Sequence, residues 1–144
     1  MKADLTRIKR YLTEIRRYSL ELNQLIEQKE LSPGSVPLKA AKYILIELAE
    51  VMSNTIQHIL AKDKGIAVSG YIDAILKAQE NGIVSEDLFQ RLKPFFDFRN
   101  SLIHRYWAVD DARLTDNIQA GRHDFDHFIE AIEAYIAANT EKPQ

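Results

Sequence analysis

The sequence predicts an all-α protein, an up-and-down bundle of four long helices and one short helix. Apolar residues recur every three or four positions almost throughout the chain, which is the spacing of one helix face. No segment alternates convincingly between apolar and polar residues, so no strand is expected. The breaks between the periodic segments are short and rich in Pro, Gly, Asn and Ser, which favours antiparallel packing of consecutive helices.

The first two predicted helices span residues 1–31 and 37–62. In the first, apolar side chains follow alternating steps of three and four, and a second row widens the stripe: Leu5, Ile8, Leu12, Ile15, Leu22 and Ile26, with Tyr11, Tyr18 and Leu25. Two prolines and a glycine then break the pattern. Ser35 is expected to cap the second helix, with Pro37 tolerated in its first turn. A polar flank without an assigned role is predicted along that helix at Glu47, Glu50, Asn54 and His58.

The remaining helices are predicted over residues 71–80, 85–106 and 110–138. Asn81-Gly82 suits a left-handed cap after the short helix, and Ser85 suits an N-cap for the next one. Pro94 should mark a kink or a restart, because it has no N–H to donate. The last segment is predicted as a single helix, and close packing on a neighbouring helix is the expected reason for its internal Gly121.

Length and composition narrow the classes of function. The chain of 144 residues fits one domain, and its net charge of −2 does not by itself indicate a nucleic-acid or membrane partner. It has no cysteine, which excludes disulfides, zinc–thiolate sites and a thiol nucleophile. The N-terminal residues are charged, and the longest uncharged stretch near the middle is too short to cross a bilayer. We therefore expect a single cytoplasmic domain.

Chemistry-bearing side chains concentrate in residues 95–107. Arg99, Asn100, His104, Arg105 and Tyr106 interrupt the apolar pattern here, and residues 91–105 carry four basic side chains and one acidic side chain. The fixed fork of donors on arginine suits phosphate, and histidine takes or gives a proton near neutral pH. Together these groups are sufficient for metal-free cleavage of RNA by its own 2′-hydroxyl.

Helix geometry restricts how these groups meet. Asn100 and His104 share a face at i and i+4, so the amide could orient the imidazole. Arg99 and His104 are five positions apart, which is about 140° around a regular helix. They converge only if the helix ends or deforms, if Arg99 reaches around it, or if a second subunit completes the site. A two-fold dimer would also supply two histidines, one as base and one as acid.

At these residues the sequence resembles a known family. Arg99-x4-His104-x-Tyr106, within the segment FRNSLIHRYW, is similar to the RX4HXY signature of HEPN-domain toxins of the HepT type. The surroundings are also similar, with a helix before the motif, then Trp107, the acidic pair Asp110-Asp111 and a long final helix. The architecture is similar over residues 1–138, and the specific resemblance covers residues 82–111.

The resemblance implies a homodimeric, HEPN-like helical ribonuclease with a composite cleft between the two chains. Arg99 and His104 would be its catalytic pair, and Asn100 a supporting residue. A cognate MNT-type nucleotidyltransferase antitoxin would transfer AMP from ATP to Tyr106, and the added phosphate would block RNA. The toxin itself would need no metal or cofactor, its substrate would be RNA, and no membrane would be involved.

Other interpretations remain open. The chain could be a non-catalytic helical partner that binds and regulates a nucleotidyltransferase, or a nucleotide-binding bundle in which Arg99 holds a phosphate. His123 and His127 at i and i+4 could share a metal, although neither belongs to an HExxH or Glu-x-x-His motif. The basic side chains of the first helix are either its solvated face or an extension of an RNA track: Arg7, Lys9, Arg10, Arg16 and Arg17.

Overall fold

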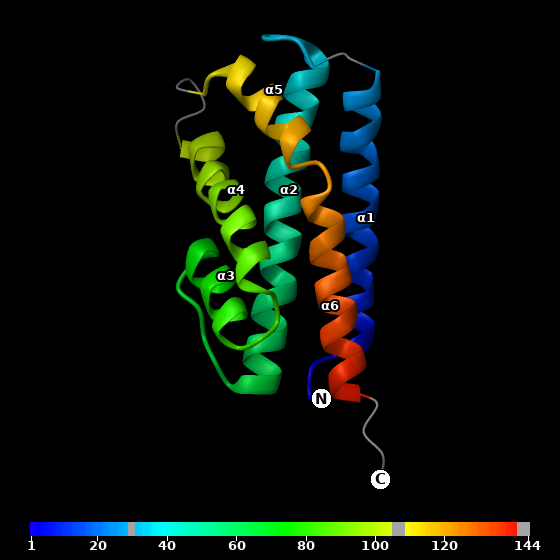
Figure 1. Ribbon diagram of the computed structural model, residues 1–144, viewed down its shortest axis with the longest axis vertical. Helices are drawn as coiled ribbons and strands as arrows, with labels where there is room; N and C mark the ends of the chain where they lie inside the picture. Colours follow the sequence, from blue (N-terminus) through cyan, green and yellow to red (C-terminus); the bar gives the residue numbers. More distant parts are fainter. Residues whose placement is uncertain (29–30, 105–108, 141–144) are drawn as a thin grey trace.

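A computed structural model describes residues 1–28, 31–104 and 109–140 of the chain (Figure 1). These ranges contain six α-helices and one turn of π-helix (η1), without a strand. In chain order they are α1 (Leu5–Glu27), α2 (Val36–Ile59), η1 (Leu60–Lys64), α3 (Tyr71–Glu80), α4 (Glu86–His104), α5 (Asp111–Ala120) and α6 (Asp124–Thr140). The all-α prediction is confirmed. Helices α1, α2, α4 and α6 run alternately up and down the long axis (Figure 1).

Helices α1 and α2 form the best-packed pair of the bundle. The Asp4 side chain accepts a hydrogen bond from the Arg7 N–H and caps α1, and Ser35 accepts from the Leu38 N–H and caps α2. The predicted cap at Ser35 is therefore confirmed, with Pro37 in the first turn. At its other end, the helical backbone continues through η1 to Lys64. Gly65 closes this turn with a φ of 66°, a left-handed conformation that suits glycine.

Helix α3 is short and α4 is long, and the turn between them follows the predicted chemistry. Gly82 adopts a φ of 74°, and the Ile83 N–H donates to the Ala78 carbonyl at 2.8 Å, which closes α3 in a left-handed cap. The Ser85 hydroxyl then accepts from the Leu88 N–H at 3.1 Å. Helix α4 continues without interruption through Pro94 to His104, so the restart considered at Pro94 does not occur.

The single helix predicted over residues 110–138 is wrong, because the chain divides there into α5 and α6. Gly121 ends α5, and its carbonyl accepts from the Asp124 N–H at 3.0 Å as α6 begins. The Arg122 side chain fixes the break against α1, where it donates to Asn23 at 2.6 Å and to Glu27 at 3.0 Å. A Cβ on Gly121 would meet the Asn117 carbonyl of α5 and the Asp124 carboxylate at the start of α6, each at 3.4 Å, so among the described residues no helix other than the two that Gly121 connects packs closely on the glycine.

The break directs α5 across the upper end of the bundle, while α6 packs along α1 (Figure 1). The core extends between the long helices, and its largest fully buried side chains come from α1, α2, η1, α3, α4 and α6: Phe96, Phe128, Ile8, Ile15, Leu22, Leu38, Leu48, Met52, Ile56, Ile59, Leu60 and Ile75. His58 is also buried, which corrects its predicted place on a polar flank of α2. No helix among the described residues is both long and apolar enough to span a membrane.

Candidate functional site

The candidate site is built on the last two turns of α4. Leu92, Phe96 and Leu102 are buried and fix α4 against the rest of the bundle. This orientation directs Arg99 toward α3 and leaves Asn100 and His104 exposed. The packing of α4 therefore decides which side chains of the motif reach other helices and which face solvent.

Among the described residues of the motif, Arg99 is the one held by side chains of other helices. Its guanidinium lies over the Tyr71 ring of α3, with Cζ 4.1 Å from the ring centroid. Nη2 lies 4.0 Å from the Glu50 carboxylate of α2, and Nη1 donates to the Asn100 side-chain oxygen at 3.3 Å. The side chain is only 18% exposed. Three helices thus hold this cation at the edge of the bundle.

Tyr71 connects Arg99 to α2. Its hydroxyl donates a hydrogen bond to Glu50, and its ring stacks on Phe96 with centroids 6.3 Å apart. Burial, followed by the bond to Glu50, raises the pKa of Tyr71 to about 12, so the hydroxyl remains a donor at neutral pH. Sequence analysis missed Tyr71 and assigned no role to Glu50. The only available signal was the helical row of polar residues on the second helix, which included Glu50.

His104 is the last residue of α4 and is exposed. Because α4 remains helical up to His104, the five-residue spacing separates it from Arg99 by about 140° around the axis. Within the described residues no hydrogen bond or ion pair joins the two side chains. The Asn100 side chain accepts a hydrogen bond from Arg99. Among the described residues no hydrogen bond joins Asn100 to His104, so the expected orienting contact is not present in one chain. One chain therefore does not bring the predicted catalytic pair together.

The other predicted residues divide between structural roles and positions outside the structure. Tyr106, the predicted site of modification, lies outside the described residues, as do Arg105 and Trp107. The Asp110 carboxylate caps α5. Asp111 accepts from the Lys42 ammonium and from the Gly34 N–H, each at 2.8 Å, and these bonds lower its carboxyl pKa. Of the acidic pair after the motif, Asp110 thus caps α5, and Asp111 anchors α5 to α2 and to the turn before α2.

The histidines of the α5–α6 region are not grouped with further metal-binding side chains among the described residues. His123 and His127 are both exposed. Within residues 1–28, 31–104 and 109–140, no three His, Cys, Asp or Glu side chains are grouped so as to hold a metal ion. Asp124, which lies between them in sequence, pairs with Arg91 at 3.3 Å.

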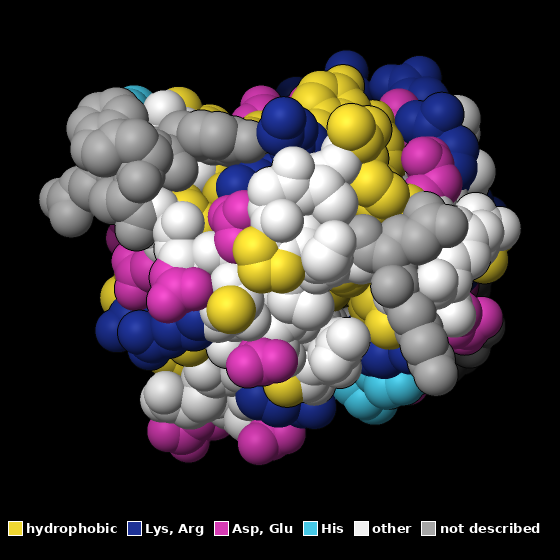
Figure 2. Space-filling model, turned by 90° about the horizontal axis from the view of Figure 1, so that it is seen from above, with side chains coloured by type: hydrophobic (Ala, Val, Ile, Leu, Met, Phe, Trp, Pro, Cys, Tyr) yellow, Lys and Arg dark blue, Asp and Glu magenta, His cyan; other side chains and the backbone are white. Residues whose placement is uncertain are grey.

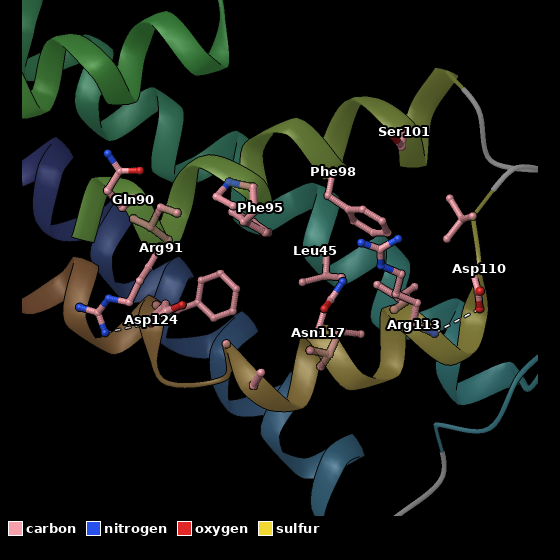
Figure 3. Close-up of a pocket in the computed structure, with 18 residues that line it drawn as sticks. Leu45, Gln90, Arg91, Phe95, Phe98, Ser101, Asp110, Arg113, Asn117 and Asp124 are labelled. Atoms are coloured by element: carbon pink, nitrogen blue, oxygen red, sulfur yellow. Dashed lines mark hydrogen bonds and ion pairs between the residues drawn. The ribbon is translucent and has the colours of Figure 1, made fainter. Parts of the chain in front are cut away.

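A pocket of about 850 Å³ opens between α4 and α5 (Figure 3). Phe95 and Phe98 of α4 and Phe125 of α6 contribute aromatic rings, and the Arg113 side chain extends from α5 toward Phe98. Phe98 directly precedes Arg99, so their side chains leave α4 about 100° apart. The pocket and the Arg99 contacts therefore occupy different faces of α4.

Charge is mixed over the end of the molecule that carries the C-terminal end of α4. In the view of Figure 2, basic and acidic side chains alternate, and no continuous basic field covers the visible surface. This agrees with the net charge of −2.

The comparisons with known proteins identify the family. The sequence model of the family described as "Ribonuclease HepT-like" matches residues 7–132. No curated protein sequence matches the chain. Among solved structures, the cytosolic protein of unknown function YutE from Bacillus subtilis has a TM-score of 0.83 at 18% identity, covering 99% of this chain and 97% of that one.

Two further similar structures are complexes. A tri-AMPylated Shewanella oneidensis HEPN toxin in complex with MNT antitoxin has a TM-score of 0.80 at 18% identity, covering 89% of this chain and 97% of that one. A mutant of the MntA-HpeT toxin–antitoxin has a TM-score of 0.77 at 18% identity, covering 90% and 98%. These similarities confirm a HEPN-like fold. The family match extends over most of the sequence, and the protein therefore belongs to the HepT-like ribonuclease family.

Proposed function

We propose that this protein is the toxin of a HEPN/MNT toxin–antitoxin pair, a homodimeric, metal-independent endoribonuclease that acts in the cytoplasm. Membership of the HepT-like ribonuclease family supports the activity. Two solved structures of similar fold are of a toxin with its antitoxin, which supports the biological setting. The observation that carries the proposal is the arrangement of Arg99 and His104, one held at the edge of the bundle and the other exposed on a different face.

This arrangement supports the proposed dimer. Arg99 is engaged by Tyr71 and is not directed around α4 toward His104 of its own chain. A second chain related by a two-fold axis can place its His104 opposite this Arg99, and symmetry then creates the same pair twice. The composite cleft of the proposal therefore takes Arg99 from one chain and His104 from the other.

The proposed reaction uses the 2′-hydroxyl of the RNA as nucleophile. His104 takes the hydroxyl proton, and the 2′ oxygen bonds to the adjacent phosphorus. The bond from phosphorus to the 5′ oxygen breaks, and that oxygen takes a proton from an imidazolium, either the same His104 or the second one of the dimer. The products are a 2′,3′-cyclic phosphate and a 5′-hydroxyl. Arg99 stabilises the charge that builds on the phosphoryl oxygens in the transition state.

Neutralisation is proposed to occur at Tyr106. The MNT-type antitoxin would transfer AMP from ATP to the tyrosine oxygen, releasing pyrophosphate. Tyr106 follows His104 by two residues, so the added phosphate would lie close to the cleft. Its negative charge repels RNA and its bulk occupies space needed by the substrate. ATP is a substrate of the antitoxin in this scheme, and the toxin itself uses no cofactor.

The test is cleavage of a labelled RNA in the presence of a chelator, with wild-type protein and with His104→Ala. Intact mass must show that neither sample carries AMP, because modified wild-type protein would be inactive for another reason. We expect cleavage by wild type and loss of cleavage in the variant. Inactivity of both unmodified proteins on several RNAs would instead favour the non-catalytic partner of a nucleotidyltransferase.

A further inference from the structure

Three side chains from three helices contact one another pairwise: Arg99 of α4, Tyr71 of α3 and Glu50 of α2. The Arg99 guanidinium covers the Tyr71 ring at 4.1 Å. The Tyr71 hydroxyl donates to Oε2 of Glu50, and the same oxygen lies 4.0 Å from Nη2 of Arg99. We call Tyr71 and Glu50 the clamp. Through these contacts Arg99, in the last turns of α4, is connected to the first residue of α3 and to the middle of α2, although the three residues lie more than twenty positions apart in the sequence.

The clamp is the main determinant of where the Arg99 guanidinium lies, because this side chain is largely buried against it. Nε of Arg99 is buried and has no hydrogen-bond partner among the described residues, and the one hydrogen bond given for the guanidinium there runs from Nη1 to the neighbouring Asn100 at 3.3 Å. The ring beneath it is itself held, because Tyr71 stacks on the fully buried Phe96. An arginine side chain has many rotamers in solution. Here one face rests on a fixed ring, which removes much of that freedom.

We propose that Tyr71 and Glu50 are positioning residues that hold Arg99 for contact with the RNA phosphate. This inference depends on the proposed function, because it assigns the residues a purpose in cleavage. The clamp leaves part of the Arg99 side chain exposed, at 18%. A cation whose orientation is set before substrate arrives stabilises the transition state without reorganising.

The contacts of Oε2 of Glu50 favour a role in positioning the Arg99 side chain over a role in neutralising its charge. Glu50 uses Oε2 for the Tyr71 hydroxyl, and its separation of 4.0 Å from Nη2 is at the outer limit of an ion pair. Its side chain is 48% exposed, so water screens its charge. Glu50 therefore acts mainly on the ring, and the ring acts on Arg99. If Glu50 only cancelled the charge of Arg99, removing it would strengthen RNA binding.

The chain contains a matched control for the clamp. Arg17 lies over the Tyr18 ring at 4.9 Å, and the Tyr18 hydroxyl donates to Glu47 at 3.5 Å. This set has the same three residue types and also uses a glutamate of α2, but its arginine is on α1 and outside the motif. Tyr18→Leu therefore repeats the removal of the ring, and Tyr18→Phe the removal of its hydroxyl, at a site away from Arg99.

The experiment measures kcat and KM for cleavage of a labelled single-stranded RNA by unmodified protein. We expect Tyr71→Leu to lower kcat by roughly 10²-fold, as the misplacement of a catalytic group does, with KM changed by less than about threefold. Tyr71→Phe keeps the ring and should restore most of kcat. Glu50→Gln should lower kcat by a smaller factor. The control variants should retain wild-type kcat.

A second readout follows the guanidinium directly. In the proton NMR spectrum of wild type, the ring current of Tyr71 should shift the side-chain signals of Arg99 upfield. The shift should disappear in Tyr71→Leu and persist in Tyr71→Phe and in the control variants. Thermal unfolding midpoints show whether each variant folds. If Tyr71→Leu does not fold, Glu50→Ala decides the question, because it removes the oxygen that accepts from the Tyr71 hydroxyl and Glu50 is exposed.

The outcomes separate the clamp from the proposed function. If wild type does not cleave RNA, or if Arg99→Ala cleaves as fast as wild type, the ribonuclease mechanism is wrong. If Arg99→Ala is inactive but folded Tyr71→Leu and Glu50→Ala keep wild-type kcat, the mechanism stands and the clamp is overturned. Tighter RNA binding with an unchanged or higher rate in Glu50→Gln would also overturn positioning, in favour of neutralisation.

Discussion

At the scale of single residues, His58 shows how a titratable group can serve the fold. It is buried, and its Nε2 accepts the Asp4 N–H at 2.8 Å at the start of α1, which requires the neutral imidazole. Burial, and then the nearby Arg7 charge, lower the pKa of His58 below its usual value of 6.5. The other charged groups that face it are Asp4, Lys62 and Asp63.

This lowered pKa predicts a pH-dependent contribution to stability. The unfolded chain binds the His58 proton more readily than the folded chain, so unfolding takes up a proton as pH falls. The contribution of His58 is complete above about pH 6.5 and decreases as pH falls toward the lower pKa of the folded state. We expect the free energy of unfolding of wild type to exceed that of His58→Gln most at pH 7.5 and least at pH 5.

Urea unfolding of both proteins at several pH values checks this prediction. The glutamine amide oxygen can accept the same N–H but does not titrate, so acid effects from other groups cancel in the comparison. A difference between the two proteins that stays constant from pH 7.5 to pH 5 would show that His58 titrates equally in the folded and unfolded states.

Whether a residue of the candidate site could be predicted from the sequence depends on whether it lies within the motif or is brought to it by packing. Arg99, Asn100 and His104 lie within six residues of one another, and their chemistry and spacing are visible in the printed order. The contacts of Arg99 with Tyr71 and Glu50 depend on the packing of α3 and α2 against α4. No local pattern encodes that packing, so these partners could be found only from the fold.

At the scale of elements, the helices whose ends carry strong local signals were predicted closely. Ser35 and Ser85 cap where expected, and Gly82 closes α3 in the left-handed conformation. The break between α5 and α6 was missed, because the apolar stripe continues through Leu114, Ile118 and Phe125 on both sides of it. Gly121 permits the helix to end there. The bonds that fix the break come from a distant helix, and periodicity carries no information about them.

Arg122 therefore should contribute to stability through the connection between α5 and α6. Its side chain is 23% exposed and donates to Asn23 and Glu27 of α1. We expect Arg122→Ala to lower the free energy of unfolding by about 1–2 kcal/mol, since a charge-assisted hydrogen bond and packing are lost.

Arg16→Ala is the matched control for this change. Arg16 pairs with Glu133 between α1 and α6, but both side chains are about half exposed, at 50% and 53%. Its loss should cost less than about 0.5 kcal/mol, as for most surface ion pairs. Chemical denaturation of the three proteins measures both values. Equal effects of the two substitutions would mean that Arg122 is one more surface pair and that Gly121 alone ends the helix.

At the scale of the whole molecule, the proposed site is incomplete within one chain. Arg99 is held toward α3, and His104 is exposed at the end of α4. If the pair forms across a two-fold axis, two inactive chains can restore each other. A mixed dimer of Arg99→Ala and His104→Ala has one Arg99 and one His104 on opposite chains, which is one complete pair in place of two.

We therefore expect equimolar Arg99→Ala and His104→Ala to regain RNA cleavage when mixed under conditions that allow chains to exchange. Random exchange makes about half of the dimers mixed, and each has at most one complete pair, so the mixture should reach at most about a quarter of wild-type activity. Neither variant alone should cleave. Native mass spectrometry of differently tagged chains establishes that mixed dimers have formed. With mixed dimers present and cleavage still absent, one of two steps of the scheme would be wrong. Either Arg99 and His104 act within the same chain, which would require α4 to deform before His104, or one His104 cannot serve as both base and acid and the second histidine is required.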